Sequence, residues 1–235
     1  VLFSRKRNNT NHPDLYFNNL KVSQVSSQKH LGFIFDTKLS FKDHIESVLD
    51  KVSRGINVLR KLRFHIPRSS LVTIYKSFIR SNLDYADVVY DQPNNSSFVN
   101  RIESLQYSAC LAVTGAIRGT SKVKLYNELG LESLSNRRWY RRLSTFFNIF
   151  SKKSPLYLYE LIPKQTHSIN TRNYHNIPQI FCRTDFFLNS FFPYTIKEWN
   201  KLDNKIKELK SSALFRSSLL KSIRPQPNSV FNLSD

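Results

Sequence analysis

Four arginines within one short segment have the spacing expected of a phosphate-binding surface. Two adjacent pairs stand four residues apart, so that on a helix they lie on one side, opposite Leu143 and Phe147. No acidic residue lies between Glu132 and Glu160 to offset their charges. Because like charges at this spacing repel each other, an anionic partner is favoured over a solvated face. This arginine row consists of Arg137, Arg138, Arg141 and Arg142.

The same arginines could instead hold the fold together by pairing with Glu128 or Glu160. The two interpretations differ in the effect of changing all four arginines to glutamine. If the row contacts phosphates, the variant keeps its stability and loses affinity for nucleic acid. If the row is structural, the melting temperature falls instead. We predict the first outcome from the sequence.

No other residue pattern in the chain indicates a catalytic or metal centre. The five glycines form no phosphate-binding loop, and the six histidines are scattered, as expected of surface or half-buried side chains. Cys110 and Cys182 lie outside any zinc-ligand spacing. The sequence therefore predicts no catalytic residue, no metal site and no cofactor in this chain.

The overall charge points to a polyanionic partner. The chain has 36 Lys and Arg against 17 Asp and Glu, a net charge of +19, and 40% apolar residues, which is enough to form a core. The charge is spread over the chain, with +7, 0, +5 and +7 in residues 1–64, 65–100, 101–150 and 151–235. Nucleic acid is therefore the expected partner, ahead of an anionic membrane.

Two further features bear on the origin of the chain. No apolar run approaches the roughly 18 residues needed to span a bilayer, and no signal peptide is recognisable, which predicts an intracellular protein. The absence of methionine suggests a fragment of a longer polypeptide.

The first part of the chain is predicted to be β-rich. Short strands are expected at Val1–Phe3, Leu15–Phe17, Leu20–Val25 and Leu31–Phe35, with a two-residue turn at Asn18 and Asn19 because asparagine tolerates positive φ.

From Ser40 onward the apolar residues follow a helical period. Residues 40–64 are predicted to form a helix that begins with a capping box at Ser40 and Asp43. Its acidic residues come early and its basic residues late, which matches the helix dipole. This charge pattern could be purely structural.

The rest of the chain is also predicted to be mostly helical, which gives a mainly α fold. A loop at residues 91–97 interrupts the helices, and residues 163–193 are expected to be irregular with one strand at Ile177–Cys182. A frayed tail is expected at 224–235. Helices are predicted at residues 71–82, 98–113, 123–129, 134–150, 195–209 and 214–223.

Several sequence blocks are similar to one known family. The first is Lys29-His30-Leu31-Gly32-Phe33, followed by His44-Ile45, and the second is Ile102-Glu103-Ser104-Leu105-Gln106 with Thr114-Gly115-Ala116-Ile117-Arg118-Gly119-Thr120 and Leu125-Tyr126-Asn127-Glu128-Leu129-Gly130. Leu83-Asp84-Tyr85 and Trp199-Asn200 complete the set. These blocks resemble the region after the palm in jockey-, CR1- and RTE-like LINE (non-LTR retrotransposon) reverse transcriptases.

The resemblance implies a division of the chain and a role for each part. Residues 1–36 would be the end of the palm with its Leu-Gly turn, residues 37–90 a helical thumb, and residues 91–223 a C-terminal helical region. The expected partners are an RNA template, a DNA primer and the missing palm and fingers, and the expected location is the nucleus and cytoplasm. The nucleic-acid-binding residues would be Lys29, Gly32, Arg54, Arg60, Lys61, Arg118 and the arginine row.

The catalytic signature of that family is missing from this chain. The family places an aromatic residue, any residue and two aspartates on a palm hairpin, where they hold paired Mg²⁺. The nearest segment, Tyr85-Ala86-Asp87-Val88, has valine in the fourth position and follows the Leu-Gly turn. The resemblance therefore implies that Mg²⁺ is bound only in the absent palm, and that this chain polymerises nothing by itself.

A different class of function stays open. The chain could be an independent or domesticated RNA- or DNA-binding module that acts without a polymerase, or the product of a decayed element. An Asp-Asp palm motif upstream of Val1 would favour the polymerase, whereas an initiator methionine would favour the module.

Overall fold

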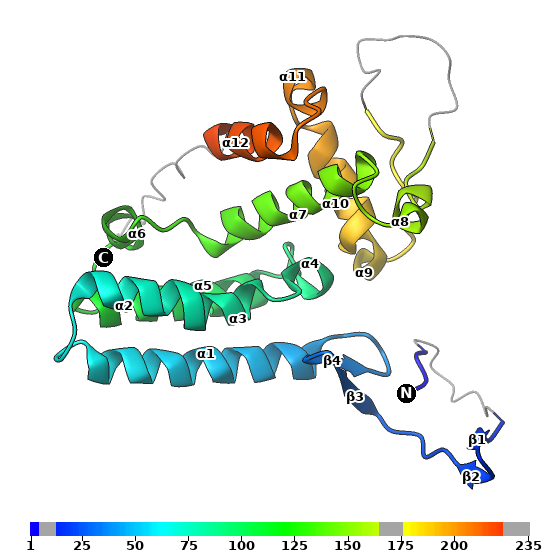
Figure 1. Ribbon diagram of the computed structural model, residues 1–235, viewed down its shortest axis with the longest axis horizontal. Helices are drawn as coiled ribbons and strands as arrows, with labels where there is room; N and C mark the ends of the chain where they lie inside the picture. The colour runs from blue at the N-terminus through cyan, green and yellow to red at the C-terminus, as the bar shows by residue number, and fades with distance from the viewer. Residues whose placement is uncertain (5–12, 165–175, 223–235) are drawn as a thin grey trace, which may run out of the picture. The chain divides into compact units, whose positions relative to one another are not determined.

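A computed structural model describes residues 1–4, 13–164 and 176–222 of the chain. Their fold is mainly α, which confirms the fold class predicted from the sequence (Figure 1). The chain forms two compact units. Unit 1 comprises Val1–Tyr90 and Ser104–Leu125, and unit 2 comprises Asp91–Glu103 and Tyr126–Asp235. The tail predicted at 224–235 lies outside the described residues.

Unit 1 has no strand at Val1–Phe3, so that prediction is wrong, and its first strands form a small hairpin. Strands β1 (Tyr16–Phe17) and β2 (Leu20–Lys21) pair antiparallel. The two residues between them, Asn18 and Asn19, have φ of 47° and 63°, so the predicted asparagine turn is confirmed.

A second hairpin follows, and its turn corrects the predicted strand at Leu31–Phe35. Strands β3 (Ser27–His30) and β4 (Phe33–Asp36) are joined by Leu31 and Gly32, whose φ values are 48° and 81°. Leu31 is therefore a turn residue rather than a strand residue. Its carbonyl accepts a hydrogen bond from the Tyr85 hydroxyl, which ties the turn to the helices of unit 1.

Helix α1 (Lys42–Leu62) begins without the predicted capping box. Its N-cap is Phe41, and no side chain caps it. Instead, the Asp36 carboxylate accepts hydrogen bonds from the backbone N–H groups of Lys38, Ser40 and Phe41 at 3.0, 3.0 and 2.7 Å. Burial raises the pKa of Asp36, but these hydrogen bonds outweigh it and hold the pKa below its ordinary value. The acid at the end of β4 thus sets the start of the helix.

The next helical rod packs closely against α1. Helix α2 (Arg68–Ile74) continues through a π-helical turn (Tyr75–Ile79) into α3 (Arg80–Asp84), and both the turn and α3 contact α1. The contact is close at Gly55, where an added Cβ would lie 2.8 Å from Cγ1 of Ile79.

Replacing Gly55 with alanine is therefore expected to destabilise unit 1. In an open helix this change gains about 1 kcal/mol, but the clash with buried Ile79 should reverse the sign and cost about 1 to 2 kcal/mol. Urea unfolding measures the difference. Adding Ile79→Ala should make the double variant more stable than the sum of the single effects predicts. A Gly55→Ala variant more stable than the wild type would contradict the close packing.

His44 lies in an aromatic cluster near the start of α1. Its ring stacks on Phe33 at 3.8 Å between centroids and meets Tyr90 edge-on at 5.0 Å. Its Nδ1 accepts a hydrogen bond from the Ile34 N–H at 3.4 Å. Burial, with a smaller contribution from Lys51, lowers the pKa of His44. The imidazole is therefore neutral in the folded protein at neutral pH.

This histidine should make unit 1 less stable in acid. The unfolded chain binds a proton on His44 at its ordinary pKa of about 6.5, whereas the folded chain binds it only at lower pH. Stability is therefore fully present above about pH 6.5 and is lost as the pH falls toward the folded pKa. Thermal melts at about pH 7.5 and pH 5 should differ less for His44→Phe than for the wild type. Equal pH dependence in both proteins would exclude this role.

Two more helices complete unit 1. Helix α4 (Asp87–Tyr90) closes the first segment, and α5 (Ser96–Thr114) contributes its second half. There the buried Tyr75 hydroxyl donates to Oε1 of Gln106 at 2.8 Å, which joins α5 to the π-helical turn.

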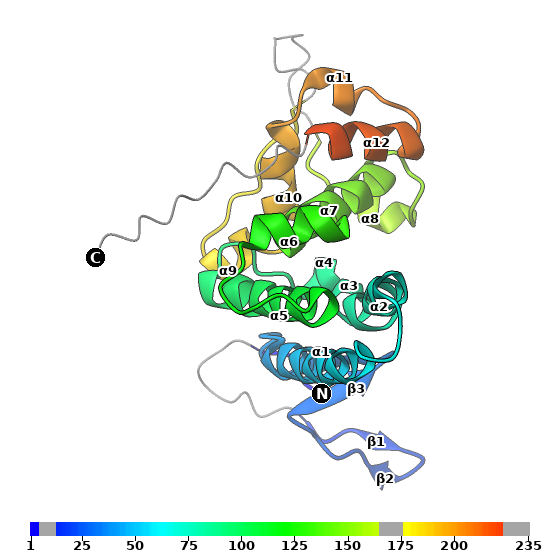
Figure 2. The same cartoon turned by 90° about the vertical axis from the view of Figure 1, so that its left-hand side faces the viewer.

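Unit 2 is built around α7 (Leu134–Phe150). Its core packs Phe146 and Phe147 against Trp199 of α10 (Phe191–Asn200) and Phe215 of α12 (Ser212–Ser222). Figure 2 shows α12 beside α7. The remaining helices of this unit are α6 (Lys122–Leu129), whose first residues belong to unit 1, α8 (Leu156–Glu160), α9 (Asp185–Leu188) and α11 (Asn204–Lys207).

Three predictions for unit 2 are wrong. The segment 163–193 is not irregular throughout, because its described part contains α9 (Asp185–Leu188) and the start of α10 at Phe191. Ile177–Cys182 forms no strand. Instead, the Ile177 N–H donates to Oδ1 of Asn200 at 2.9 Å, and Nδ2 of Asn200 donates to the Ile177 carbonyl at 2.8 Å. The predicted helix 195–209 is broken after Asn200, because the Asp203 carboxylate accepts from the Lys205 N–H and starts α11 as its N-cap. Side chains thus replace a strand ladder and interrupt a helix.

Candidate nucleic-acid interface

The second half of α1 presents a row of cations to solvent. Lys51, Arg54, Arg60 and Lys61 are all exposed, as is Arg63 directly after the helix. The buried face of α1 carries its apolar residues and His44, so the cations lie on the other side. Arg60 and Lys61 occupy the last turn, where the helix dipole favours positive charge.

The loop between α5 and α6 brings further cations to unit 1. Gly115 and Gly119 have φ of 73° and 101°, and the Gly119 N–H donates to the Tyr107 hydroxyl at 2.9 Å. The ammonium group of Lys122 lies 5.8 Å from the centroid of the same tyrosine ring. Arg118 is exposed between the two glycines. The loop is therefore anchored on α5 while its charges face water.

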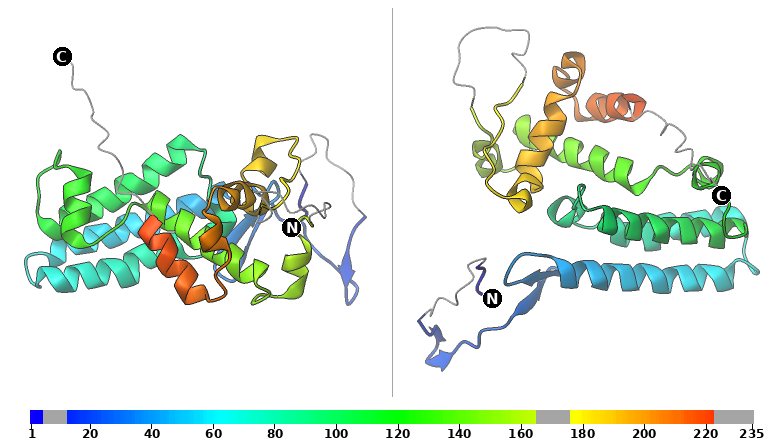
Figure 3. Two further views of the ribbon diagram at one scale, coloured as in Figure 1. Left: turned by 90° about the horizontal axis from the view of Figure 1, so that it is seen from above. Right: turned by 180° about the vertical axis from the view of Figure 1, so that it is seen from behind.

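These two segments meet at one end of unit 1. A Cβ added to Gly115 would lie 3.3 Å from Nη2 of Arg63, so the end of α1 and the loop are in contact. The end of α1, the start of α2 and the end of α5 also lie together in two independent views (Figures 1 and 3). We call this surface the basic end of unit 1. It consists of Arg60, Lys61, Arg63, Arg118 and Lys122.

The basic end is formed by two stretches of the chain that contain no acidic residue. No Asp or Glu lies between Asp50 and Asp84 or between Glu103 and Glu128. Eight cations occupy the first of these intervals, and three occupy the second. They are Lys51, Arg54, Arg60, Lys61, Arg63, Arg68, Lys76 and Arg80, then Arg118, Lys122 and Lys124. Such a surface attracts polyanions, because neutralising each phosphate releases condensed counterions.

Lys29 and Gly32 lie away from the basic end. They belong to the β3–β4 hairpin, and β4 contacts α1 beside its first residues. Both are exposed. Because α1 has 21 residues and rises 1.5 Å per residue, its two ends are about 30 Å apart. The structure therefore does not bring these two residues together with Arg60 and Lys61.

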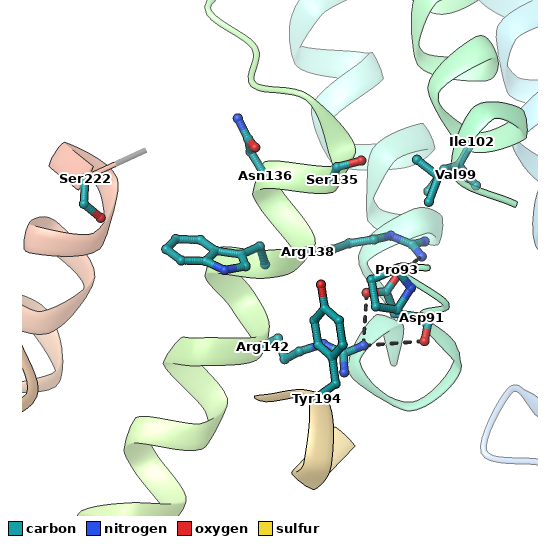
Figure 4. A pocket seen from close by; sticks show the side chains of 11 residues that line it. Asp91, Pro93, Val99, Ile102, Ser135, Asn136, Arg138, Arg142, Tyr194 and Ser222 are labelled. Carbon is teal, nitrogen blue, oxygen red and sulfur yellow. Dashed lines mark hydrogen bonds and ion pairs between the residues drawn. The ribbon is translucent and has the colours of Figure 1, made fainter. Parts of the chain in front are cut away.

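The arginine row of α7 is not the solvent-facing surface expected from the sequence. Arg138 and Arg142 are only 4% and 2% exposed. Arg138 Nη1 lies 3.0 Å from Asp91 Oδ1, and Arg142 Nη2 lies 3.0 Å from Asp91 Oδ2 (Figure 4). One carboxylate therefore holds two guanidinium groups, an arrangement we call the Asp91 clamp.

Aromatic rings cover both arginines of the clamp. The Arg138 guanidinium lies 5.1 Å from the Phe98 ring centroid, and that of Arg142 lies 5.0 Å from the Tyr194 ring centroid. Such cation–π contacts are strongest where water is excluded. The clamp thus joins α7 to the segment before α5 and to α10, all within unit 2.

The expectation that no acid offsets the row is therefore wrong. Arg137 Nη1 lies 2.8 Å from Glu132 Oε1, while Arg138 and Arg142 share an acid that is distant in the sequence. The acid that Arg138 and Arg142 share is Asp91. Of the row, Arg137 and Arg141 remain partly exposed. The missed signal was Asp91, an acid in a polar loop that sequence spacing does not connect to α7.

A cavity of about 350 Å³ lies beside the clamp. Arg138, Arg142, Trp139 and Tyr194 line it (Figure 4). Burial raises the pKa of Tyr194, and Glu198 and Asp91 raise it further against the opposing effect of Arg142. Its hydroxyl therefore keeps its proton at neutral pH and can donate a hydrogen bond.

Neither a metal site nor a membrane span is found in the part of the chain that the structure describes. No group of three His, Cys, Asp or Glu side chains there could hold a metal ion. Asp87, the aspartate of the segment nearest to the family's catalytic signature, is 1% exposed, and its Oδ1 accepts a hydrogen bond from the Val88 N–H at 3.0 Å. None of the described helices is long and apolar enough to cross a bilayer.

Comparison with known proteins finds a distant relative among transposon polymerases. Over 160 residues the chain is 24% identical to a Drosophila melanogaster protein named probable RNA-directed DNA polymerase from transposon X-element. The match covers 67% of this chain but only 16% of that relative. No family profile matches the chain, and no solved structure matches it. The match supports a relationship to a transposon reverse transcriptase.

Proposed function

We propose that this chain is the part of a non-LTR retrotransposon reverse transcriptase that follows the palm, and that it holds the RNA template and DNA primer. The observation that carries this proposal is the basic end of unit 1, where cations from two acid-free stretches of the chain meet. Phosphate contacts of this kind give affinity and orientation without sequence specificity.

The distant relative supports the polymerase assignment. Because the match covers 16% of that protein, the activity of the whole polypeptide is part of the proposal. In this proposal residues 1–36 end the palm, residues 37–90 form the thumb, and residues 91–223 form the C-terminal helical region. The palm and fingers of the same polypeptide supply the Mg²⁺-binding carboxylates, and the protein works in the nucleus and cytoplasm.

The proposed contacts differ between the two units. In unit 1 we assign phosphate contacts to Arg54 and to the basic end, and a separate contact near the primer end to Lys29 and Gly32. In unit 2 only the partly exposed Arg137 and Arg141 are proposed as contacts. The buried arginines of the Asp91 clamp are assigned to the fold rather than to nucleic acid.

The proposal is tested by binding a fluorescent RNA·DNA duplex to the full chain. The five contacts of the basic end alone would make affinity fall by roughly two to three orders of magnitude between about 50 and 200 mM salt. Unrelated duplex sequences should bind equally well, since no base-reading motif is present. Affinity that does not change with salt would refute the proposal.

Primer extension separates the chain from the complete enzyme. We expect no incorporation of nucleotides by this polypeptide with Mg²⁺ or Mn²⁺, because the paired carboxylates belong to the palm. Extension above a control without protein would show that the catalytic residues lie in this chain.

A further inference from the structure

Phe64 is an exposed aromatic side chain inside the basic end of unit 1. It is the second residue after α1 and is 75% exposed. A single exposed apolar side chain is common and needs no explanation by itself. The neighbours of Phe64 make it different, because they are cations that have no acidic counterpart in either segment.

The ring of Phe64 has one face covered and the rest open. The Arg63 guanidinium lies over the ring at 4.7 Å from its centroid. Arg63 also lies beside Gly115, where an added Cβ would come within 3.3 Å of its Nη2. Because Gly115 has no side chain, Arg63 has room between the loop and the ring. The open area of Phe64 is therefore available to a second flat group.

The backbone of this turn is held in a defined conformation. The Arg63 N–H donates to the Leu59 carbonyl at 3.0 Å, and the N–H groups of His65 and Ile66 donate to the Leu62 carbonyl at 2.9 and 3.1 Å. The ring is thus carried by an ordered turn between two helices. An ordered platform loses little conformational entropy when a ligand stacks on it.

We propose that Phe64 is a stacking platform for an unpaired base, so that the basic end of unit 1 recognises the junction between a duplex and a single strand. Aromatic rings among cations are the common arrangement for binding single-stranded nucleic acid, since every base has a π face and every nucleotide a phosphate. Bases inside a duplex are already stacked on both faces. Only an unpaired base, which can leave the helical stack, can therefore insert against Phe64. This inference rests on the proposed nucleic-acid function and adds the kind of strand that is bound.

The test measures affinity of the full chain for two probes. One is a blunt RNA·DNA duplex, and the other is the same duplex with a short single-stranded overhang. Phe64→Ala is expected to weaken binding of the overhang probe by about 5- to 100-fold, because stacking contributes on the order of 1 to 3 kcal/mol per base. Binding of the blunt duplex should change by less than about twofold.

Two control variants accompany this change. Phe17→Ala removes a ring that is 72% exposed in the β1–β2 hairpin of the same unit and should leave both affinities unchanged. Phe64→Trp should retain or strengthen binding of the overhang probe, because tryptophan also presents a flat ring. All three variants should have the melting temperature of the wild type, since the changed side chains are exposed. A fluorescent base analogue at the first unpaired position should be quenched by the wild type and not by Phe64→Ala.

The outcomes distinguish this inference from the proposed function. If Phe64→Ala binds the overhang probe as the wild type does, or weakens both probes equally, the platform is refuted while duplex binding stands. If the wild type binds neither probe, the proposed function fails and the platform fails with it.

Discussion

Replacing Asp91 with asparagine is expected to destabilise unit 2 by about 3 to 5 kcal/mol, because the change removes the carboxylate that two buried guanidinium groups share. The Asp91 side chain is 7% exposed, and its two partners are 4% and 2% exposed. For a unit of this size the melting temperature should fall by roughly 10 to 20 °C. Differential scanning calorimetry measures the shift.

Two control variants accompany this test, one at another ion pair and one at the clamp itself. Glu132→Gln breaks the partly exposed pair with Arg137 and should cost less than about 1 kcal/mol. Replacing Asp91 with leucine together with Arg138 and Arg142 by methionine removes all three charges and should recover most of the stability. An Asp91→Asn protein with the melting temperature of the wild type would show that the clamp does not stabilise unit 2.

The clamp also reverses the expectation for the arginine row as a whole. Changing all four arginines to glutamine should now lower the melting temperature, because two of them fill buried positions against one carboxylate. The effect on nucleic-acid binding should come only from the partly exposed Arg137 and Arg141.

Removing the five charges of the basic end is expected to give the largest loss of nucleic-acid affinity. With Arg60, Lys61, Arg63, Arg118 and Lys122 changed to glutamine, the slope of log affinity against log salt should fall by up to about 4 units, at 0.7 to 0.9 per contact. At about 50 mM salt the affinity should fall by several orders of magnitude. Fluorescence anisotropy over a salt series gives both values.

A variant with the same change in net charge serves as the control. Five exposed cations of unit 2 can be changed to glutamine, which also lowers the net charge from +19 to +14. They are Lys201, Lys205, Lys210, Arg216 and Lys221. If this control loses as much affinity and slope as the basic-end variant, total charge accounts for binding and the assigned surface is wrong.

Local patterns predicted most of the helices, because each pattern lies within a few turns of chain. The helical period over residues 40–64 gave α1, and the apolar spacing from Leu134 gave α7 with its observed bounds. The turn at Asn18 and Asn19 was predicted for the same reason, since asparagine tolerates positive φ wherever it occurs in the chain.

Predictions failed where a single side chain outside the recognised pattern bonds the backbone. Asp36 starts α1 in place of Ser40, and the Asn200 amide pairs with Ile177 in place of a neighbouring strand. Neither contact leaves a periodic signal, because one residue makes it. The π-helical turn opposite Gly55 is similar, since it depends on packing between two helices.

The sequence alone determined that this protein is mainly α-helical, strongly basic and similar to a transposon reverse transcriptase, since composition, periodicity and motif order are properties of the chain itself. Only the tertiary structure decided which cations face solvent. Arg138 and Arg142 are buried because the fold brings Asp91 to them, whereas Arg63 and Arg118 share a surface because α1 and α5 end together. The physical reason is that a charge acts over a few ångströms of space, and distance in space between residues far apart in the chain is set by packing.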